Sequence, residues 1–386
     1  MMSKRKKNKK IRTDFKQRYD DRTRQNDLTR EFNDSDHETT ESHERISGKG
    51  KLARKRTIRG EEVESDEGTE IILEIDDLCR PGLVLSVHGL NSFVEAENGD
   101  VFKCATRKLL KTISTDQRHI VVAGDNIQFR PQADGTKEGL IVRVEPRFGT
   151  ISRTSRKKQH VIAANIEQML IVTSAAMPEL KPHLIDRLLV TAEKSRIKPI
   201  ICINKADLVD PADFQPIVGG FSQLGYRTMM VSAETGRSID VLRDILKEKK
   251  SVVVGQSGVG KSSLLNAIQP GLGLRVGRVS EENQKGKHTT TAAKLIELSF
   301  GGHIVDTPGI RQFELWDVIS GEIAGFFREL RPFTDRCKFP NCTHTHESDC
   351  LVKNAVADGD LDIRRYESYC LLVEECDEND KRQTQN

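Results

Sequence analysis

Residues 255–263 read GQSGVGKSS, and this stretch decides the fold of the central part of the chain. Its first eight residues match G-x-x-x-x-G-K-[ST], a loop that binds phosphate groups. An apolar run at 251–254 precedes it and helical spacing at 264–268 follows it, which is the strand–loop–helix context the motif requires. Glycines let successive backbone N–H groups point at phosphate oxygens. We therefore predict phosphate contacts from Gly255, Gln256, Ser257, Gly258, Val259, Gly260, Lys261, Ser262 and Ser263.

A second motif, Asn204-Lys205-Ala206-Asp207, predicts that the base of the bound nucleotide is guanine. It follows the apolar run at 199–203, so it lies at a carboxyl end of the sheet, where ligands bind in this class of fold. The Asp207 carboxylate can accept hydrogen bonds from the ring N–H and the exocyclic amine of guanine, a pair that adenine lacks. Asn204 and Lys205 are expected to brace this loop and cover the base. Ser232-Ala233, after the run at 227–231, fits the loop whose backbone N–H contacts the guanine carbonyl.

Catalytic and magnesium-binding groups are expected around the γ-phosphate. Lys261 is expected to reach the β- and γ-phosphates, and the Ser262 hydroxyl to ligate Mg²⁺. In the segment Asp306-Thr307-Pro308-Gly309, Asp306 suits an outer contact to Mg²⁺ and the Gly309 N–H suits the γ-phosphate. The run Lys287-His288-Thr289-Thr290-Thr291 lies between these motifs, and Thr290 is our choice for the second magnesium ligand. An exposed strand edge is the alternative explanation for such a run of threonines.

The order of these motifs is unusual. Ordinary small GTPases run from the phosphate loop through the threonine and D-x-x-G to N-K-x-D and S-A. Here N-K-x-D and S-A come first, so the same set is circularly permuted. Apolar runs alternate with helical spacing, as at 182–194 and 239–246, from about residue 166 onward. This alternation predicts a doubly wound α/β domain with a mostly parallel sheet over residues 149–330.

Residues 79–148 have the pattern of a small antiparallel barrel. Six short apolar runs, broken by turn residues such as Asn98-Gly99, predict strands at 83–88, 92–97, 100–105, 119–123, 126–130 and 140–144. An OB-fold and an SH3-like barrel fit this pattern about equally well. Because an OB-fold is a common nucleic-acid-binding barrel, this region is a candidate RNA contact.

The N-terminal segment, residues 1–78, is expected to be an unstructured tail. Residues 1–70 contain few apolar side chains, too few to offset the entropy of ordering them. The first 30 residues carry twelve Lys and Arg against four Asp. This balance favours either a polyphosphate partner or a merely solubilising tail.

The composition also excludes some classes of protein. No run of 18 apolar residues predicts a transmembrane helix, and no apolar segment follows the basic N-terminus as in a signal peptide. We therefore expect a cytoplasmic protein with no membrane partner, whose eight cysteines stay reduced.

The C-terminal part, residues 331–386, contains a cluster of cysteines and histidines with the spacing of a metal site. Cys337, Cys342 and Cys350 surround two histidines, His344 and His346. Three thiolates and one imidazole close the tetrahedral shell of a structural Zn²⁺, leaving no open position for catalysis. Either histidine could be the fourth ligand on this pattern alone.

The permuted order, the stretches GQSGVGKSS, KHTTT and DTPGI, and the metal cluster together resemble a bacterial family, the ribosome small subunit-dependent GTPase A (RsgA, also YjeQ). The resemblance covers about residues 79–370 and implies an OB-fold, a central GTPase domain and a C-terminal helical zinc domain. It selects His344 as the fourth ligand of one Zn²⁺ per chain. It also implies a monomer that binds GTP or GDP with Mg²⁺ and acts late in assembly of the small (30S) ribosomal subunit through contacts to its rRNA.

One departure from ordinary GTPases bears on catalysis. Ile310 follows D-x-x-G, where a glutamine usually orients the attacking water, and an aliphatic side chain cannot do so. His288 is the nearest candidate for that role, with a loop or RNA contact as the alternative. Two other functions stay open on the sequence. One is a GTP switch that binds a polyanion other than the ribosome, and the other is an RNA-binding scaffold whose G domain does not hydrolyse GTP.

Overall fold

The computed structural model describes residues 10–14, 55–65, 68–73, 77–106, 110, 120–133, 135–155, 158–274, 293–306 and 318–384. The chain divides into two compact units, residues 1–147 and 148–386. Within the described residues, no helix is both long and apolar enough to cross a membrane.

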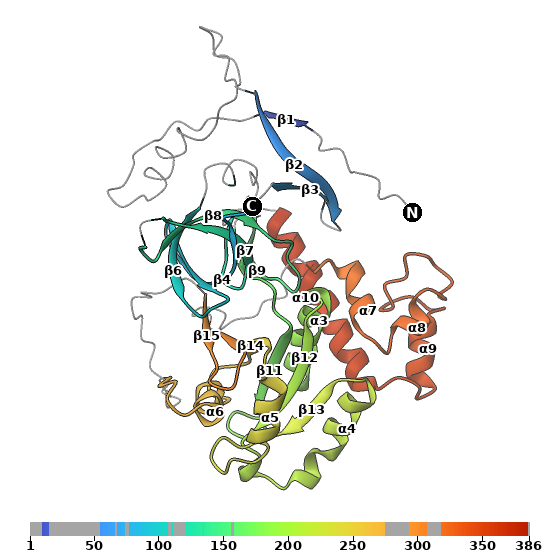
Figure 1. Ribbon diagram of the computed structural model, residues 1–386. Coiled ribbons are helices and arrows are strands. Elements are labelled where there is room, and N and C mark those ends of the chain that lie inside the picture. The colour runs from blue at the N-terminus through green and yellow to red at the C-terminus, as the bar shows by residue number, and fades with distance from the viewer. Residues whose placement is uncertain are drawn as a thin grey trace, which may run out of the picture. The chain divides into compact units, whose positions relative to one another are not determined.

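The first unit contains a closed five-stranded barrel (Figure 1). Its strands are β4 (Arg80–His88), β5 (Asn91–Ala96), β6 (Val101–Thr106), β7 (Asn126–Pro131) and β8 (Glu138–Val144). They follow the order β4-β5-β6-β8-β7, and β4 also pairs with β7, which closes the barrel. Strands β6 and β8 pair in parallel, and all the other pairs in the barrel are antiparallel. This five-stranded Greek-key closure is OB-like and confirms the OB choice over an SH3-like barrel.

The barrel differs from the prediction at residues 119–123. No strand is present over the described residues 120–125, although Val121 and Val122 are buried as a strand would require. The reason is the buried Asp125 carboxylate. It accepts hydrogen bonds from the Val122 N–H at 2.8 Å and from the Arg147 guanidinium at 2.7 Å, and Arg147 also donates to the Ile120 carbonyl. Side chains thus hold the Val122 N–H and the Ile120 carbonyl, while the Gly124 N–H and the Asp125 carbonyl pair with the backbone of Val84 in β4.

Three more strands lie in the N-terminal segment, where the composition predicts an unstructured tail. They are β1 (Lys10–Asp14), β2 (Lys55–Ser65) and β3 (Gly68–Leu73), which form an antiparallel sheet in the order β1-β2-β3. An antiparallel ladder satisfies backbone hydrogen bonds without a large apolar surface, so a count of apolar side chains does not detect it.

The second unit is built on a six-stranded sheet in the order β13-β12-β11-β14-β16-β15. Its strands are β11 (Gln168–Ser174), β12 (Lys198–Asn204), β13 (Arg227–Met230), β14 (Lys250–Val254), β15 (Lys294–Glu297) and β16 (His303–Asp306). All neighbours are parallel except β15 and β16. A hairpin of β9 (Ile151–Ser155) and β10 (Lys158–Ala163), which the sequence does not predict, precedes this sheet.

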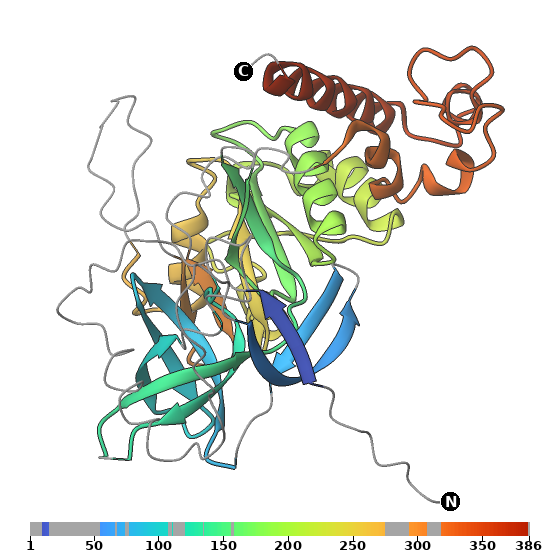
Figure 2. The same ribbon diagram turned by 90° about the horizontal axis from the view of Figure 1, so that it is seen from above.

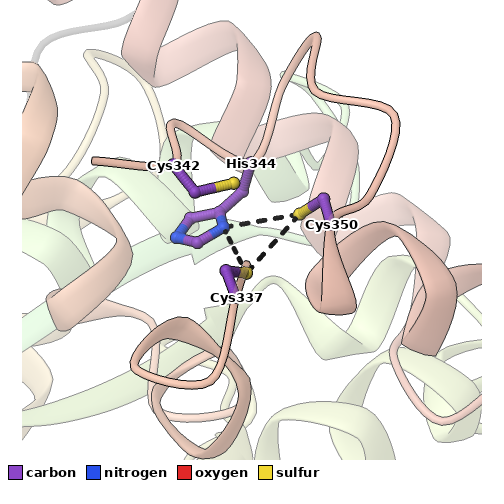
Figure 3. Close-up of side chains that lie close together, drawn as sticks. All are labelled: Cys337, Cys342, His344 and Cys350. Atoms are coloured by element: carbon purple, nitrogen blue, oxygen red, sulfur yellow. Dashed lines mark hydrogen bonds between the residues drawn. The ribbon is translucent and has the colours of Figure 1, made fainter. Parts of the chain in front are cut away.

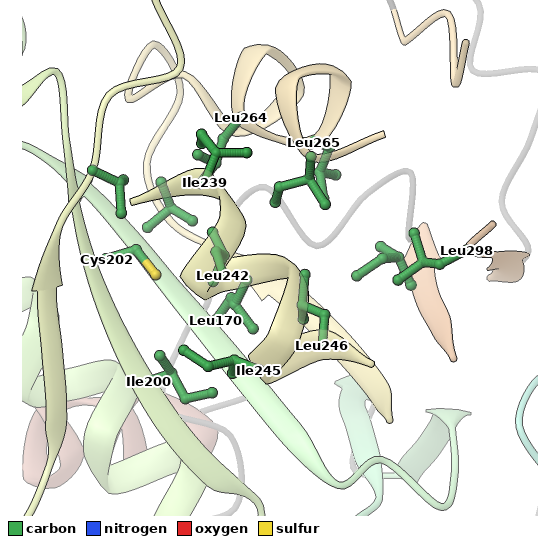
Figure 4. Packing of buried hydrophobic residues seen from close by; sticks show 14 of the residues in the cluster. Leu170, Ile200, Cys202, Ile239, Leu242, Ile245, Leu246, Leu264, Leu265 and Leu298 are labelled. Carbon is green, nitrogen blue, oxygen red and sulfur yellow. The ribbon is translucent and has the colours of Figure 1, made fainter. Parts of the chain in front are cut away.

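Helices cover this sheet and form its core with it. They are α3 (Pro182–Lys194), α4 (Gln215–Gln223), α5 (Ile239–Leu246) and α6 (Lys261–Ile268), with short 3₁₀ turns η1 (Ala206–Leu208) and η2 (Pro211–Phe214). Leu170 and Ile200 of the sheet pack against Leu242 of α5 and Leu264 of α6 (Figure 4). The predicted helices at 182–194 and 239–246 are confirmed.

The C-terminal part is helical, as predicted beyond residue 321. It contains η3 (Ser320–Glu322), α7 (Ile323–Phe326), α8 (Arg331–Thr334), α9 (Leu351–Ala357) and α10 (Ile363–Thr384). Helix α10 runs beside α3 in both ribbon views (Figure 2). Val190 of α3 belongs to the same apolar cluster as Phe327, Tyr369 and Leu372. The C-terminal helices therefore share an apolar core with α3 of the sheet domain.

Candidate nucleotide and metal sites

The phosphate-binding loop follows β14 and leads into α6, as the sequence predicts. Gly255 has φ +143°, and a Cβ atom there would lie 2.0 Å from the Val172 carbonyl oxygen. Gly260 has φ +89°, and a Cβ atom there would lie 2.5 Å from Asn204 Nδ2. Both positions therefore require glycine for backbone conformation and for space.

Lys261 is the first residue of α6, and its ammonium group lies over this loop. Its Nζ donates to the carbonyl of Gly255 at 2.8 Å and to that of Gln256 at 2.7 Å. The ammonium group thus lies where the loop would receive phosphate oxygens, as its proposed role requires. Ser262 and Ser263 follow it in the first turn of α6, at the positive end of that helix.

Asn204 connects three of the predicted motifs. It is the last residue of β12 and is only 1% exposed. Its Nδ2 donates to the Val259 carbonyl of the phosphate loop at 2.9 Å, and its Oδ1 accepts from the Ala233 N–H at 3.3 Å. The sequence predicts a bracing role for Asn204, but not that it joins two loops that lie far apart in the chain.

Asp207 lies just beyond, on η1, with an exposed side chain. One carboxylate oxygen accepts a hydrogen bond from the buried Ser232 hydroxyl, which in turn accepts from the Thr235 N–H at 3.1 Å. Lys205 has a left-handed backbone, and its ammonium group donates to the Met177 carbonyl. Asp207 is thus oriented from one side while its carboxylate remains open to solvent, the arrangement needed to receive a base.

The remaining predicted groups of the nucleotide site can be placed only in part. Asp306 is the last residue of β16, whose neighbour β14 carries the phosphate loop. The run Lys287–Thr291, which includes His288 and Thr290, lies outside the described residues, as do Gly309 and Ile310.

The metal cluster is assembled as the sequence predicts (Figure 3). The Sγ atoms of Cys337 and Cys350 each lie 3.4 Å from His344 Nδ1 and 4.0 Å from one another. One donor atom from each of these residues and from Cys342 falls within 4.8 Å of the others. Tetrahedral zinc, at ~2.3 Å from sulfur and ~2.0 Å from nitrogen, separates its donors by roughly 3.5–3.8 Å. The donor set therefore fits zinc in both chemistry and spacing.

Burial shifts the pKa of two of these ligands. Burial lowers the pKa of His344, so that its imidazole is neutral and free to coordinate. Burial raises the pKa of the Cys342 thiol to about 12. A thiolate at that position requires a cation to stabilise it, which a metal ion supplies.

Hydrogen bonds from outside the cluster hold its loop in place. The Tyr366 and Tyr369 hydroxyls of α10 donate to the carbonyls of His344 at 2.9 Å and Thr343 at 2.6 Å. Burial alone would raise the pKa of Glu347, but hydrogen bonds from Thr343 lower it to about 2. By contrast, the competing histidine, His346, has a side chain that is 79% exposed.

Comparison with known proteins bears on this combination of sites. The family model described as RsgA GTPase matches residues 144–316. The small ribosomal subunit biogenesis GTPase RsgA of Shewanella oneidensis is 35% identical over 337 residues, covering 85% of this chain and 94% of that protein. The chain belongs to the RsgA GTPase family. It is therefore a GTPase by family, with the permuted motif order described above.

Other relatives agree with this assignment. The protein of the same name from Thermotoga petrophila is 40% identical over 303 residues, covering 77% of this chain and 97% of that one. The crystal structure of YjeQ from Thermotoga maritima aligns with a TM-score of 0.65 at 35% identity, over 78% of this chain and 99% of that one. The structure of YloQ, a circularly permuted GTPase, aligns with a TM-score of 0.63 at 28% identity, over 79% of this chain and 98% of that one.

Proposed function

We propose that this chain hydrolyses GTP to GDP and phosphate during assembly of the small ribosomal subunit and that the subunit stimulates the reaction. The observation that carries the proposal is the joining of the three nucleotide motifs through Asn204 in a chain of the RsgA family. The named function of the relatives, small ribosomal subunit biogenesis, supplies the partner.

In this proposal the described residues each have one role toward the nucleotide. The Asp207 carboxylate accepts from the ring N–H and amine of guanine, and a backbone N–H of the Ser232-Ala233 loop contacts the guanine carbonyl. The glycine loop holds the phosphates through its backbone N–H groups, while Lys261 exchanges its two carbonyl contacts for β- and γ-phosphate oxygens. Asn204 fixes the distance between the base-binding and phosphate-binding loops.

The residues proposed to bind magnesium and to orient the attacking water lie partly within and partly outside the described residues. Ser262 would hold Mg²⁺ together with Thr290, with Asp306 in an outer contact. The ion, when bound, neutralises charge that develops on the phosphates. Ile310 offers no hydrogen bond to a water, so we propose that His288 completes this role when the subunit is bound. Intrinsic hydrolysis is then slow.

The zinc cluster is proposed to hold one Zn²⁺ per chain in a structural role. Cys337, Cys342, His344 and Cys350 complete four-coordination, so a bound ion would keep no open position for chemistry. Its function would be to fold the loop before α9, which has little apolar content of its own. The folded loop and the OB-like barrel are the proposed rRNA contacts of a monomeric, cytoplasmic protein.

Co-sedimentation tests this proposal. Purified small subunits should carry the chain down with a non-hydrolysable GTP analogue and release much of it with GDP. No co-sedimentation in either state would favour the GTP switch with another polyanionic partner. Binding to subunits without any GTP turnover would instead favour the RNA-binding scaffold.

A further inference from the structure

A cavity of about 500 Å³ opens at the amino ends of β12 and β13. The predicted nucleotide motifs all lie at the opposite, carboxyl ends of the parallel strands, so this cavity is separate from the nucleotide site. Its walls come from two strands, from α4 and its following turn, and from the segment before α8. They are formed by Lys198, Pro199, Ser222, Gly225, Tyr226, Arg227, Thr228 and Arg328.

Two exposed cations stand at its rim. Lys198 is the first residue of β12 and Arg227 is the first residue of β13, and these strands are parallel neighbours. In the register of these strands Arg227 lies beside Ile200, two residues along from Lys198. With ~4.8 Å between strands and ~3.3 Å of rise per residue, the two Cα atoms are roughly 8 Å apart, so two long side chains can reach the same stretch of a ligand. Within the part of the chain that the structure describes, neither side chain has an ion-pair partner.

On the side of the cavity formed by Arg328 and Tyr226, the charged side chains are already paired with one another. The Arg328 guanidinium donates to Glu193 at 2.7 Å and to the carbonyls of Leu224 and Gly225, and it lies 4.1 Å from the centre of the Tyr226 ring. Arg331 pairs with the second oxygen of Glu193 at 2.9 Å. Glu329, the other described carboxylate that acts on Tyr226, binds Arg365 at 2.6 Å. Both of these carboxylates are thus matched by arginines, which leaves the rim with excess positive charge.

We propose that this cavity binds the phosphate backbone of RNA. The inference rests on the proposed function, because that function supplies RNA as the partner. Two unneutralised cations beside an open cavity attract phosphodiester groups through release of counterions. The Tyr226 ring is buried and covered by Arg328, so it offers no face on which a base could stack. The contact therefore positions the domain on RNA without reading its sequence.

The test uses the full-length chain loaded with a non-hydrolysable GTP analogue. Lys198→Ala and Arg227→Ala are each compared with Lys247→Ala, which removes one exposed cation after α5. Affinity for purified small subunits is measured between about 50 and 200 mM salt. The two cavity variants should bind roughly tenfold more weakly at low salt, and the slope of log affinity against log salt should fall by about 1. GDP affinity, which depends on the opposite edge of the sheet, should stay unchanged.

A second arm separates RNA from a free anion. Inorganic pyrophosphate is titrated into GDP-loaded protein, wild type and Lys198→Ala. Weaker subunit binding by the cavity variants, with no pyrophosphate binding at this site, supports an RNA contact. Pyrophosphate binding that Lys198→Ala abolishes, with subunit binding unaffected, overturns it. Cavity variants that match Lys247→Ala in affinity and salt slope also overturn it. A wild-type chain that does not bind subunits at all contradicts the proposed function itself and removes the partner on which this inference rests.

Discussion

At the residue scale, the nucleotide site depends on a few side chains that join separate loops. Asn204 contacts Val259 and Ala233, which lie 55 and 29 residues further along the chain. The sequence predicts each motif because its residue types match the chemistry of a phosphate or a base. It does not predict the joining bonds, because they depend on how β12 and β14 are spaced in the sheet. The requirement for glycine at position 260 has the same origin, since Asn204 occupies the space of a side chain there.

Nucleotide choice is predicted to depend on Asp207. Asp207→Asn replaces a group that only accepts hydrogen bonds with an amide that both donates and accepts, so the guanine amine loses its partner. GTP affinity should fall by more than tenfold, while xanthosine triphosphate, which carries a carbonyl in place of that amine, should bind better.

The measurement is a titration of both nucleotides against Asp207→Asn and Asp210→Asn. Asp210 lies three residues away, and its carboxylate accepts from the Ala212 N–H at the start of η2 instead of facing the base-binding loop. GTP affinity that is equal in the two variants would refute the role of Asp207.

At the element scale, two structural units stabilise the C-terminal part. One is the loop with the metal cluster, whose carbonyls are held by Tyr366 and Tyr369 of α10. The other is the packing of α10 on α3, where a buried ion network crosses the interface. Arg365 of α10 is 2% exposed and binds both Asp186 of α3, which is fully buried, and Glu329 at 2.6 Å. Charges buried this deeply stabilise only as a complete set.

Loss of one metal ligand should release zinc and loosen its loop. Cys342→Ser removes a thiolate, and because the metal supplies folding free energy, hydrogen exchange should rise over residues 337–350. GTP affinity should hardly change. Elemental analysis should find about one zinc per chain in the wild type and in Cys370→Ser, a change at a half-buried cysteine of α10 outside the cluster. A metal-free wild-type chain whose residues 337–350 remain protected from hydrogen exchange would contradict the assignment.

Removal of one member of the buried network should destabilise the contact between α3 and α10. Asp186→Ala leaves the Arg365 guanidinium buried with only part of its compensation, a change that costs about 3–5 kcal/mol in other proteins. Urea unfolding should show the loss as a lower free energy of unfolding. Asp244→Ala, at an exposed carboxylate on α5, should change it by less than about 0.5 kcal/mol. Equal values for the two variants would show that the network contributes nothing.

Elements with a regular apolar pattern are the ones that the sequence predicts well. Helices α3 and α5 occur where helical spacing of apolar residues places them, because that spacing buries one face. Helix α4 is missed because Gly219 and Gly220 lower its helix propensity. The strand predicted at 119–123 is absent from its described residues, 120–123, because a tertiary contact, Arg147 with Asp125, replaces a local pattern.

At the scale of the whole molecule, the circular permutation changes the connections between elements but keeps the described nucleotide motifs at one edge of the sheet. Strands β13 and β12, which lead into the Ser232 loop and carry the Asn204 motif, are adjacent, and β14 with the phosphate loop lies beyond β11. These parallel strands direct their carboxyl ends to the same edge of the sheet although their order in the chain is altered. The permuted connection also leads from β16 to the C-terminal helices, which share a core with α3. The division between a GTPase domain at 149–330 and a zinc domain at 331–386 stays a prediction, since both ranges lie in one compact unit.

The central claim is a GTPase that depends on its partner, and steady-state GTP turnover with and without purified small ribosomal subunits tests it most directly. The isolated chain should turn over slowly, because Ile310 cannot orient water. Subunits should accelerate it strongly, as activating partners do in other GTPases by ~10³–10⁵-fold. The stimulated rate should fall steeply with added salt while the intrinsic rate hardly changes. His288→Ala should remove most of the stimulation and leave GTP affinity intact. Turnover by the isolated chain that equals the rate with subunits at low salt would contradict the account.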